Sequence, residues 1–149
     1  MRKSKRVLGL ESMPMSPLLQ RYVSFEGRLA RLPFFIRGIY LAIAAIVIFF
    51  ASIPLFSSGS RLAWWLGVIL VVAAIAVLGV GTVSLIVRRL HDLGLSGVHA
   101  IWVGAAEFGW TVISEAPASA QVLALPLLAI VLWLQFYPGK PGANRFGAP

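Results

Sequence analysis

One feature constrains this chain more than any other: residues 62–87 form an uninterrupted uncharged run rich in Leu, Ile, Val and Ala. A bilayer is crossed by roughly 20 apolar residues in a helix, so this run is long enough to span one. Across all 149 residues, 59% are hydrophobic and 12% are charged, where a soluble domain carries roughly 25% charged residues. The sequence therefore predicts an integral membrane protein.

Four apolar windows are candidates for spanning helices, at approximately 35–56, 62–87, 98–114 and 116–137. The segments between them are short, and short connections join neighbouring helices that run in opposite directions. We therefore expect an all-α membrane protein, an antiparallel bundle of four transmembrane helices that occupies residues 25–149 and ends in a C-terminal loop. Pro126 is expected to kink the fourth span.

The distribution of basic residues predicts the orientation of the bundle. With four spans, all but one of the 13 basic residues lie on one side, and the exception is Arg61. Lys and Arg collect on the cytoplasmic side, so both termini are expected there (N-in, C-in). Residues 1–24 have no clear periodicity and are interpreted as a flexible basic cytoplasmic tail. The apolar run after the first basic residues, Val7 to Leu10, is too short for a signal peptide, so no cleavage is expected.

Three polar segments fall on this cytoplasmic side and hold the candidate binding residues. The first precedes the first span, the second joins the second and third spans, and the third follows the fourth span. Their candidate residues are, in order, Gly27, Arg28 and Arg31; Arg88, Arg89, His91, Asp92, Gly94, Ser96 and Gly97; and Asn144 and Arg145. We expect the three segments to meet, with Asp92 accepting from at least one arginine.

The middle segment has the pattern of a helix end followed by a tight turn. Asp92 lies one turn from Arg88 and Arg89, so it can pair with either. Gly94 is a suitable left-handed terminator, and Ser96 can cap the following helix. The simplest interpretation is a structural ion pair. A second is that His91, next to Asp92, acts as a general base, but no nucleophile pattern accompanies it.

The same segments resemble a known family. F-x-G-R-x-x-R before the first span, R-R-L-H-D-x-G-x-S-G in the middle and P-G-x-x-G-x-N-R-F-G at the end are similar to the bacterial membrane proteins grouped as domain of unknown function 805. The resemblance covers residues 25–149. It implies a small, multi-pass protein of the bacterial inner membrane and implies no activity.

Glu107 is a separate candidate because it lies near the middle of the third predicted span. An acidic residue at that depth usually faces the bundle interior or water and is a functional candidate by default. The alternative is a protonated or hydrogen-bonded structural residue. If Glu107 titrates during transport, we expect it to face a cavity with a partner such as Gln121 or Gln135.

Composition narrows the chemistry further. The chain has no cysteine, two histidines and a single aspartate, so thiolate chemistry is excluded and a metal site is difficult to assemble. We expect no cofactor and no metal, and we do not expect an enzyme. The excess of basic residues is explained by membrane orientation and by contact with anionic lipid headgroups, so no nucleic acid partner is expected.

Two hypotheses remain for function. The first is an interaction module whose basic cytoplasmic face, built from the three segments, binds an anionic lipid or a membrane or cytoplasmic protein. The second is a small transport or ion-coupled protein that uses Glu107. Four helices enclose little space, so transport would require a homo-oligomer.

Overall fold

The computed structural model describes residues 16–115, 117, 122 and 125–148. These residues are helical, with no β-strand beyond an isolated bridge between Asn144 and Gly147. The elements are α1 (Pro17–Val23), α2 (Arg31–Ser57), α3 (Arg61–Asp92), the 3-10 helix η1 (Gly97–His99), α4 (Ala100–Ser114) and α6 (Leu125–Phe136).

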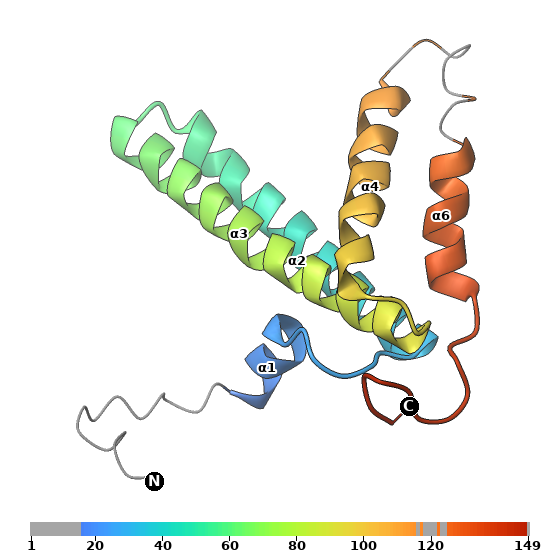
Figure 1. Ribbon diagram of the computed structural model, residues 1–149. Helices are drawn as coiled ribbons and strands as arrows, with labels where there is room; N and C mark the ends of the chain where they lie inside the picture. The colour runs from blue at the N-terminus through green and yellow to red at the C-terminus, as the bar shows by residue number, and fades with distance from the viewer. Residues whose placement is uncertain (1–15, 116, 118–121, 123–124, 149) are drawn as a thin grey trace, which may run out of the picture.

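The helices α2 and α3 form a long antiparallel hairpin (Figure 1). They contain 27 and 32 residues and are long and apolar enough to cross a membrane. Few residues in their apolar segments are buried, whereas the core helix of a soluble protein would be mostly buried. The turn between them is short, and the side chain of Ser60 caps α3 by accepting from the amide of Ala63. At that end, Gly67 allows α3 to approach Phe56 of α2 closely.

The helices α4 and α6 form a second, shorter pair. They have 15 and 12 residues, so they are about 22 Å and 18 Å long at the standard rise of ~1.5 Å per residue. Leu127 of α6 packs closely against Gly109 of α4. The expected kink at Pro126 is wrong: this proline is the second residue of α6. The first-turn amides of a helix have no acceptor to lose, so proline is tolerated there.

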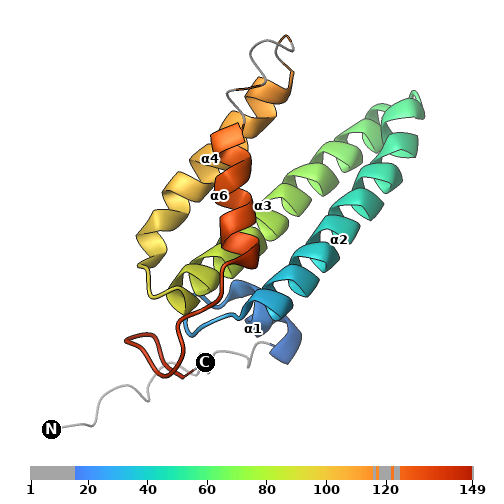
Figure 2. The ribbon, with the colours of Figure 1, turned by 90° about the vertical axis from the view of Figure 1, so that its right-hand side faces the viewer.

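The two pairs meet at one end and diverge from it in the view of Figure 1. At this end, here called the base, lie the start of α2, the end of α3, the start of α4, the end of α6 and the C-terminal loop (Figures 1 and 2). The pairs touch through α3 with α4 and through α2 with α6. The expected alternation of helix directions is present, but the four helices do not pack as one bundle along their whole length.

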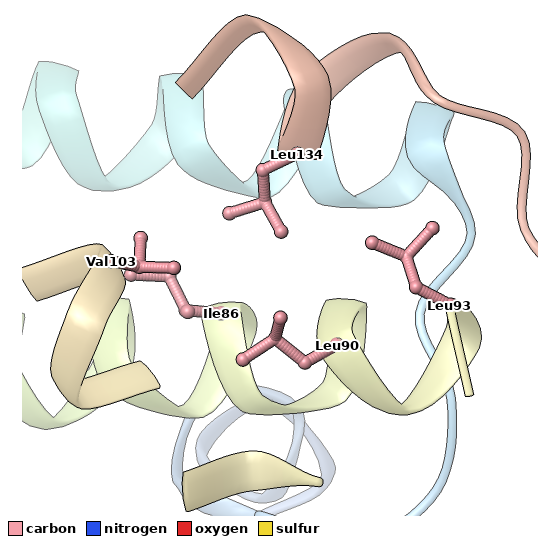
Figure 3. Close-up of a cluster of buried hydrophobic side chains, with 5 residues drawn as sticks. All are labelled: Ile86, Leu90, Leu93, Val103 and Leu134. Carbon is pink, nitrogen blue, oxygen red and sulfur yellow. The ribbon is translucent and has the colours of Figure 1, made fainter. Parts of the chain in front are cut away.

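The hydrophobic core also lies near the base. Figure 3 shows its five buried side chains converging from α3, α4, α6 and the turn after α3. These are Ile86, Leu90, Leu93, Val103 and Leu134. The core is small because most large apolar side chains of α2 and α3 are exposed.

Part of the segment expected to be a flexible tail is a helix. Residues 1–15 lie outside the described part, but Pro17–Val23 forms α1, which packs against α3. Proline fits the first position of a helix because its fixed φ is already helical. The following residue, Ser24, accepts a hydrogen bond from the hydroxyl of Ser84, which is fully buried on α3. The folded part of the chain therefore begins before residue 25.

Candidate functional site

The three polar segments meet at the base through backbone hydrogen bonds. The amide of Leu29 donates to the carbonyl of Arg88 at 3.0 Å, which joins the first segment to the end of α3. The amide of Lys140 donates to the carbonyl of Asp92 at 2.9 Å, which joins the C-terminal loop to the same turn. The end of α3 is therefore the centre on which the other two segments are fixed.

Asp92 is the charged centre of this assembly. Its Oδ1 lies 3.0 Å from Nη2 of Arg28, and its Oδ2 lies 2.7 Å from Nη1 of Arg89. All three side chains are buried; that of Arg89 is fully enclosed. One carboxylate thus balances two guanidinium groups, and the cluster, named here the Asp92 cluster, keeps one net positive charge. Asp92 accepts from Arg28 and Arg89, as expected for an acidic group among basic segments.

Backbone carbonyls stabilise the remaining charge of the Asp92 cluster. Arg89 donates from Nε to the carbonyl of Leu134 at 2.9 Å and from Nη2 to the carbonyl of Tyr137. Arg28 likewise donates to carbonyls of the C-terminal loop, those of Lys140, Gly142 and Gly147. Every guanidinium nitrogen of the two arginines therefore has an acceptor, which buried charges require. These contacts fix the loop that follows α6.

His91 and Asn144 form a second layer beside the Asp92 cluster. Nδ1 of His91 lies 3.1 Å from the carbonyl oxygen of Gly27, and its ring stacks on Phe146 with centroids 3.8 Å apart. Asn144 donates to the carbonyl of His91 at 3.0 Å and accepts from the amide of Phe146 at 2.8 Å. His91 is thus oriented by a carbonyl and a ring, while the carboxylate of Asp92 is paired with arginines. The two side chains do not form a base and orienting-acid pair.

The glycines and the serine of the motifs shape the backbone. Gly94 has φ +76° and Gly27 has φ +80°, values that L side chains rarely adopt. Ser96 caps η1 by accepting from the amide of Val98, as predicted. A Cβ on Gly97 would lie 2.8 Å from a methyl of Val87, so the chain passes close to α3 there. These residues position the loops of the base.

Arg31, Arg88 and Arg145 lie outside the Asp92 cluster. Arg31 is exposed and lines a groove with residues of α2 and α6. Arg88 points away from Asp92: its Nη1 donates to the carbonyl of Arg21 on α1 at 3.1 Å. The guanidinium carbon of Arg145 lies 4.7 Å from the ring centroid of Phe146. Of the two arginines predicted as partners of Asp92 on α3, only Arg89 pairs with it.

Glu107 lies on α4 and lines a cavity of about 470 Å³ between the two helix pairs. The cavity is bounded by side chains from α2, α3, α4 and α6, and most of them are apolar. Its polar contributors include Thr82, Glu107 and Gln135. Glu107 and Gln135 therefore line the same cavity, as expected for a partner of Glu107. Gln121, the other expected partner, lies outside the described residues.

Besides the residues whose carbonyls accept from Arg28 and Arg89, Gly139 and Phe146 contribute to the base and were not predicted as site residues. Gly139 packs so closely on Asp92 that a Cβ there would lie 2.0 Å from Oδ2, and Phe146 supplies the ring that covers His91. Both belong to the C-terminal motif, so the sequence contained the signal, but their contacts depend on tertiary structure. Within the part of the chain that the structure describes, no three His, Cys, Asp or Glu side chains are grouped as metal ligands would be.

The fold and the base define a class: an all-helical protein with two long apolar helices whose polar motifs fold together around a buried aspartate. The model of the family described as "Protein of unknown function (DUF805)" matches residues 22–148. The chain belongs to this family, as the resemblance of its three motifs indicated. No curated protein and no solved structure matches the chain.

Proposed function

We propose that this protein is a multi-pass protein of the bacterial inner membrane with its base in the cytoplasm. Two helices with the required length and apolar surface support membrane insertion. The orientation follows from charge: among the basic residues that the structure describes, Arg61 is the one at the far end of the hairpin. Lys and Arg favour the cytoplasmic side. The fourth crossing would include residues that precede α6, because α6 alone is shorter than a span.

Reporter fusions test this topology. A reporter placed after Pro149 should be cytoplasmic, and one placed after Gly59 should be external. A fusion after Pro117 should also be external if α4 and α6 belong to two complete crossings. An external C-terminus, or a cytoplasmic reporter after Pro117, would contradict the four-span arrangement.

Within this topology, the base acts as an interaction module for an acidic protein partner. The observation that carries this proposal is the Asp92 cluster, which joins all three motifs into one platform. The charged groups of the cluster are paired or hydrogen-bonded inside the protein, so we assign partner binding to the exposed cations around it. We define these as the basic rim: Arg31, Lys140 and Arg145, all exposed. Lys140 and Arg145 lie on a loop fixed by Arg28, so their positions are set before a partner arrives.

Charge reversal on the basic rim is the direct test. In the full-length protein, Lys140→Glu combined with Arg145→Glu should abolish cross-linking to a partner in native membranes. Neither side chain is a partner of Asp92, so the fold should persist. Arg61→Glu, at the far end, is the matched control and should leave the cross-link unchanged. A partner retained by the double variant, or lost equally in the control, would refute the role of the basic rim.

A transport function is the second candidate, and the cavity shared by Glu107 and Gln135 favours it. A carboxylic acid between helices is a common component of ion-coupled sites in membranes. Glu107→Gln should then abolish proton-linked flux in proteoliposomes while the protein remains folded and oligomeric. Unchanged flux, or a protein that is monomeric in the bilayer, would argue against transport.

A further inference from the structure

A second basic site lies on the other side of the base, between α1 and α2. It is a pocket of about 410 Å³, and the residues that line it combine two arginines with two tyrosines and an apolar edge. They are Arg21, Tyr22, Pro33, Ile36, Arg37 and Tyr40. None of these six belongs to the candidate site residues predicted from the sequence.

The arginines around this pocket lack the partners that Arg28 and Arg89 have. Nη1 of Arg37 and Nε of Arg88 are both buried and have no hydrogen-bond partner within the described structure. Arg88 does not line the pocket, but its Nη1 donates to the carbonyl of Arg21, a residue that does. Both ion pairs in the described part of the chain involve Asp92, so no carboxylate there forms a salt bridge with Arg21, Arg37 or Arg88.

The charges themselves favour an anion. Burial lowers the pKa of the Arg88 guanidinium, and the positive charge of Arg37 lowers it further. Buried polar groups are normally hydrogen-bonded, and buried cations are normally paired. An anionic group in the pocket that accepts several hydrogen bonds would satisfy the unpartnered nitrogen of Arg37, which lines the pocket, and would offset the positive charges of Arg37 and Arg88. Phosphate oxygens match the planar fork of donors on arginine, and tyrosine hydroxyls add further donors.

We propose that this pocket binds the phosphate of an anionic phospholipid headgroup. The proposal rests on the proposed membrane topology but uses none of the residues of the basic rim. Arg37 is in the second turn of α2, about 9 Å along the helix from Arg31, and this places the pocket at the depth expected for lipid headgroups. Basic pockets beside the cytoplasmic ends of membrane helices are typical sites for such lipids.

The surface of α2 next to the pocket explains why a lipid fits better than free phosphate. Ile36 and Tyr40 form its edge, and Ile43 and Val47 continue along the same face of the helix at helical spacing. These four side chains are 41%, 60%, 51% and 60% exposed. They form an apolar strip that leads away from the arginines along the membrane-spanning part of α2. An acyl chain can lie on this strip while its phosphate occupies the pocket.

Native mass spectrometry of the full-length protein in detergent can test the proposal. The probes are phosphatidylglycerol, phosphatidylcholine and inorganic phosphate, each added separately. The wild-type protein should retain phosphatidylglycerol in preference to phosphatidylcholine. Arg37→Gln should weaken that retention about tenfold, since a hydrogen bond to a charged group is lost. Arg21→Gln, on the exposed side of the pocket, should weaken it as well and gives an answer even if the variant at Arg37 fails to fold.

A single-charge control separates a site from general attraction. Arg61→Gln removes the same charge at the far end of the hairpin and should leave lipid retention unchanged. Equal losses in all three variants would overturn the proposal, as would equal retention of the two lipids. Tight binding of inorganic phosphate that displaces phosphatidylglycerol would instead indicate a site for a soluble anion and would also overturn the assignment to lipid. Partner capture through Lys140 and Arg145 is a separate measurement, so either proposal can fail alone.

Discussion

The base and the far end of the molecule differ in what holds them together. At the base, charged side chains are buried and hydrogen-bonded, and the small hydrophobic core lies beside them. Along the long hairpin, large apolar side chains are exposed; Phe49, Phe50 and Ile69 are each 63% exposed. In lipid, exposed apolar groups cost nothing and helices gain little from burying them against each other. In the proposed membrane topology, polar interactions at the base therefore specify the tertiary arrangement, and the bilayer supports the helices beyond it.

Replacing Asp92 should cause the largest loss of stability, because Asp92 is the charged centre of the base. Asp92→Asn leaves the buried guanidinium groups of Arg28 and Arg89 without a counter-charge, which typically costs about 3–5 kcal/mol. We expect a large loss of thermal stability in detergent and of abundance in membranes. Glu26→Gln is the control: Glu26 is exposed and precedes the cluster, so its neutral variant should behave as wild type. A stable Asp92→Asn protein would show that the base does not depend on its ion pairs.

Truncating a core leucine should rank next. Leu90 is 1% exposed and packs in the core at the base. Leu90→Ala leaves a cavity there and should cost about 2–5 kcal/mol. Leu66→Ala on the same helix is the matched control: Leu66 is 50% exposed, and its side chain meets lipid or detergent both before and after helix association. Denaturation in mixed micelles should separate the two. Equal costs would remove the distinction between the base and the far end.

The sequence predicted the structure best in the two long helices, where hydrophobicity alone indicates the position of the helix. The runs predicted at 35–56 and 62–87 lie inside α2 and α3, but each helix continues into charged residues, to Arg31 at one end and to Asp92 at the other. Apolar windows detect the part of a helix whose side chains are apolar, and they cannot detect a polar turn stabilised by tertiary contacts. This limit explains why the Asp92 cluster lies at the end of a helix that was predicted to stop earlier.

Local chemistry predicted single contacts but not which segment each side chain meets. The left-handed turn at Gly94 and the cap at Ser96 follow from residue type and position. By sequence spacing, Arg88 and Arg89 were equally suitable partners of Asp92. In the structure, Arg89 pairs with Asp92, and Arg88 donates to a carbonyl of α1. Neighbouring residues on a helix point about 100° apart, so only one of the two can face the C-terminal loop. Which one does so depends on packing.

Gly139 tests how closely the C-terminal loop must approach the Asp92 cluster. A Cβ at Gly139 would overlap the carboxylate of Asp92, so Gly139→Ala should displace the loop or the carboxylate and cost about 1–3 kcal/mol. Gly104→Ala is the control because nothing lies within 4 Å of the position of its Cβ, and alanine favours a helix over glycine. The control should be neutral or slightly stabilising. Thermal unfolding in one detergent measures both variants.

The smallest expected effect concerns the stack of His91 on Phe146. The two rings are nearly parallel, with an interplanar angle of 8°, and they attach the end of the C-terminal loop to α3. Phe146→Ala should cost only about 1 kcal/mol, the range typical of one aromatic contact. Because Arg28 and Asn144 still hold the loop, global unfolding should change little. Hydrogen exchange should therefore increase in residues 143–148 and not in α3.

Phe108→Ala is the control for that measurement, since Phe108 is 72% exposed on α4. It should leave exchange in residues 143–148 unchanged. If Phe146→Ala instead accelerates exchange throughout the end of α3, the stack belongs to the same cooperative unit as the Asp92 cluster. In that case, the whole base opens as one cooperative unit, which is separate from the hairpin. If exchange stays unchanged everywhere, the hydrogen bonds of Arg28 and Asn144 are sufficient to hold the loop, and the ring merely covers His91.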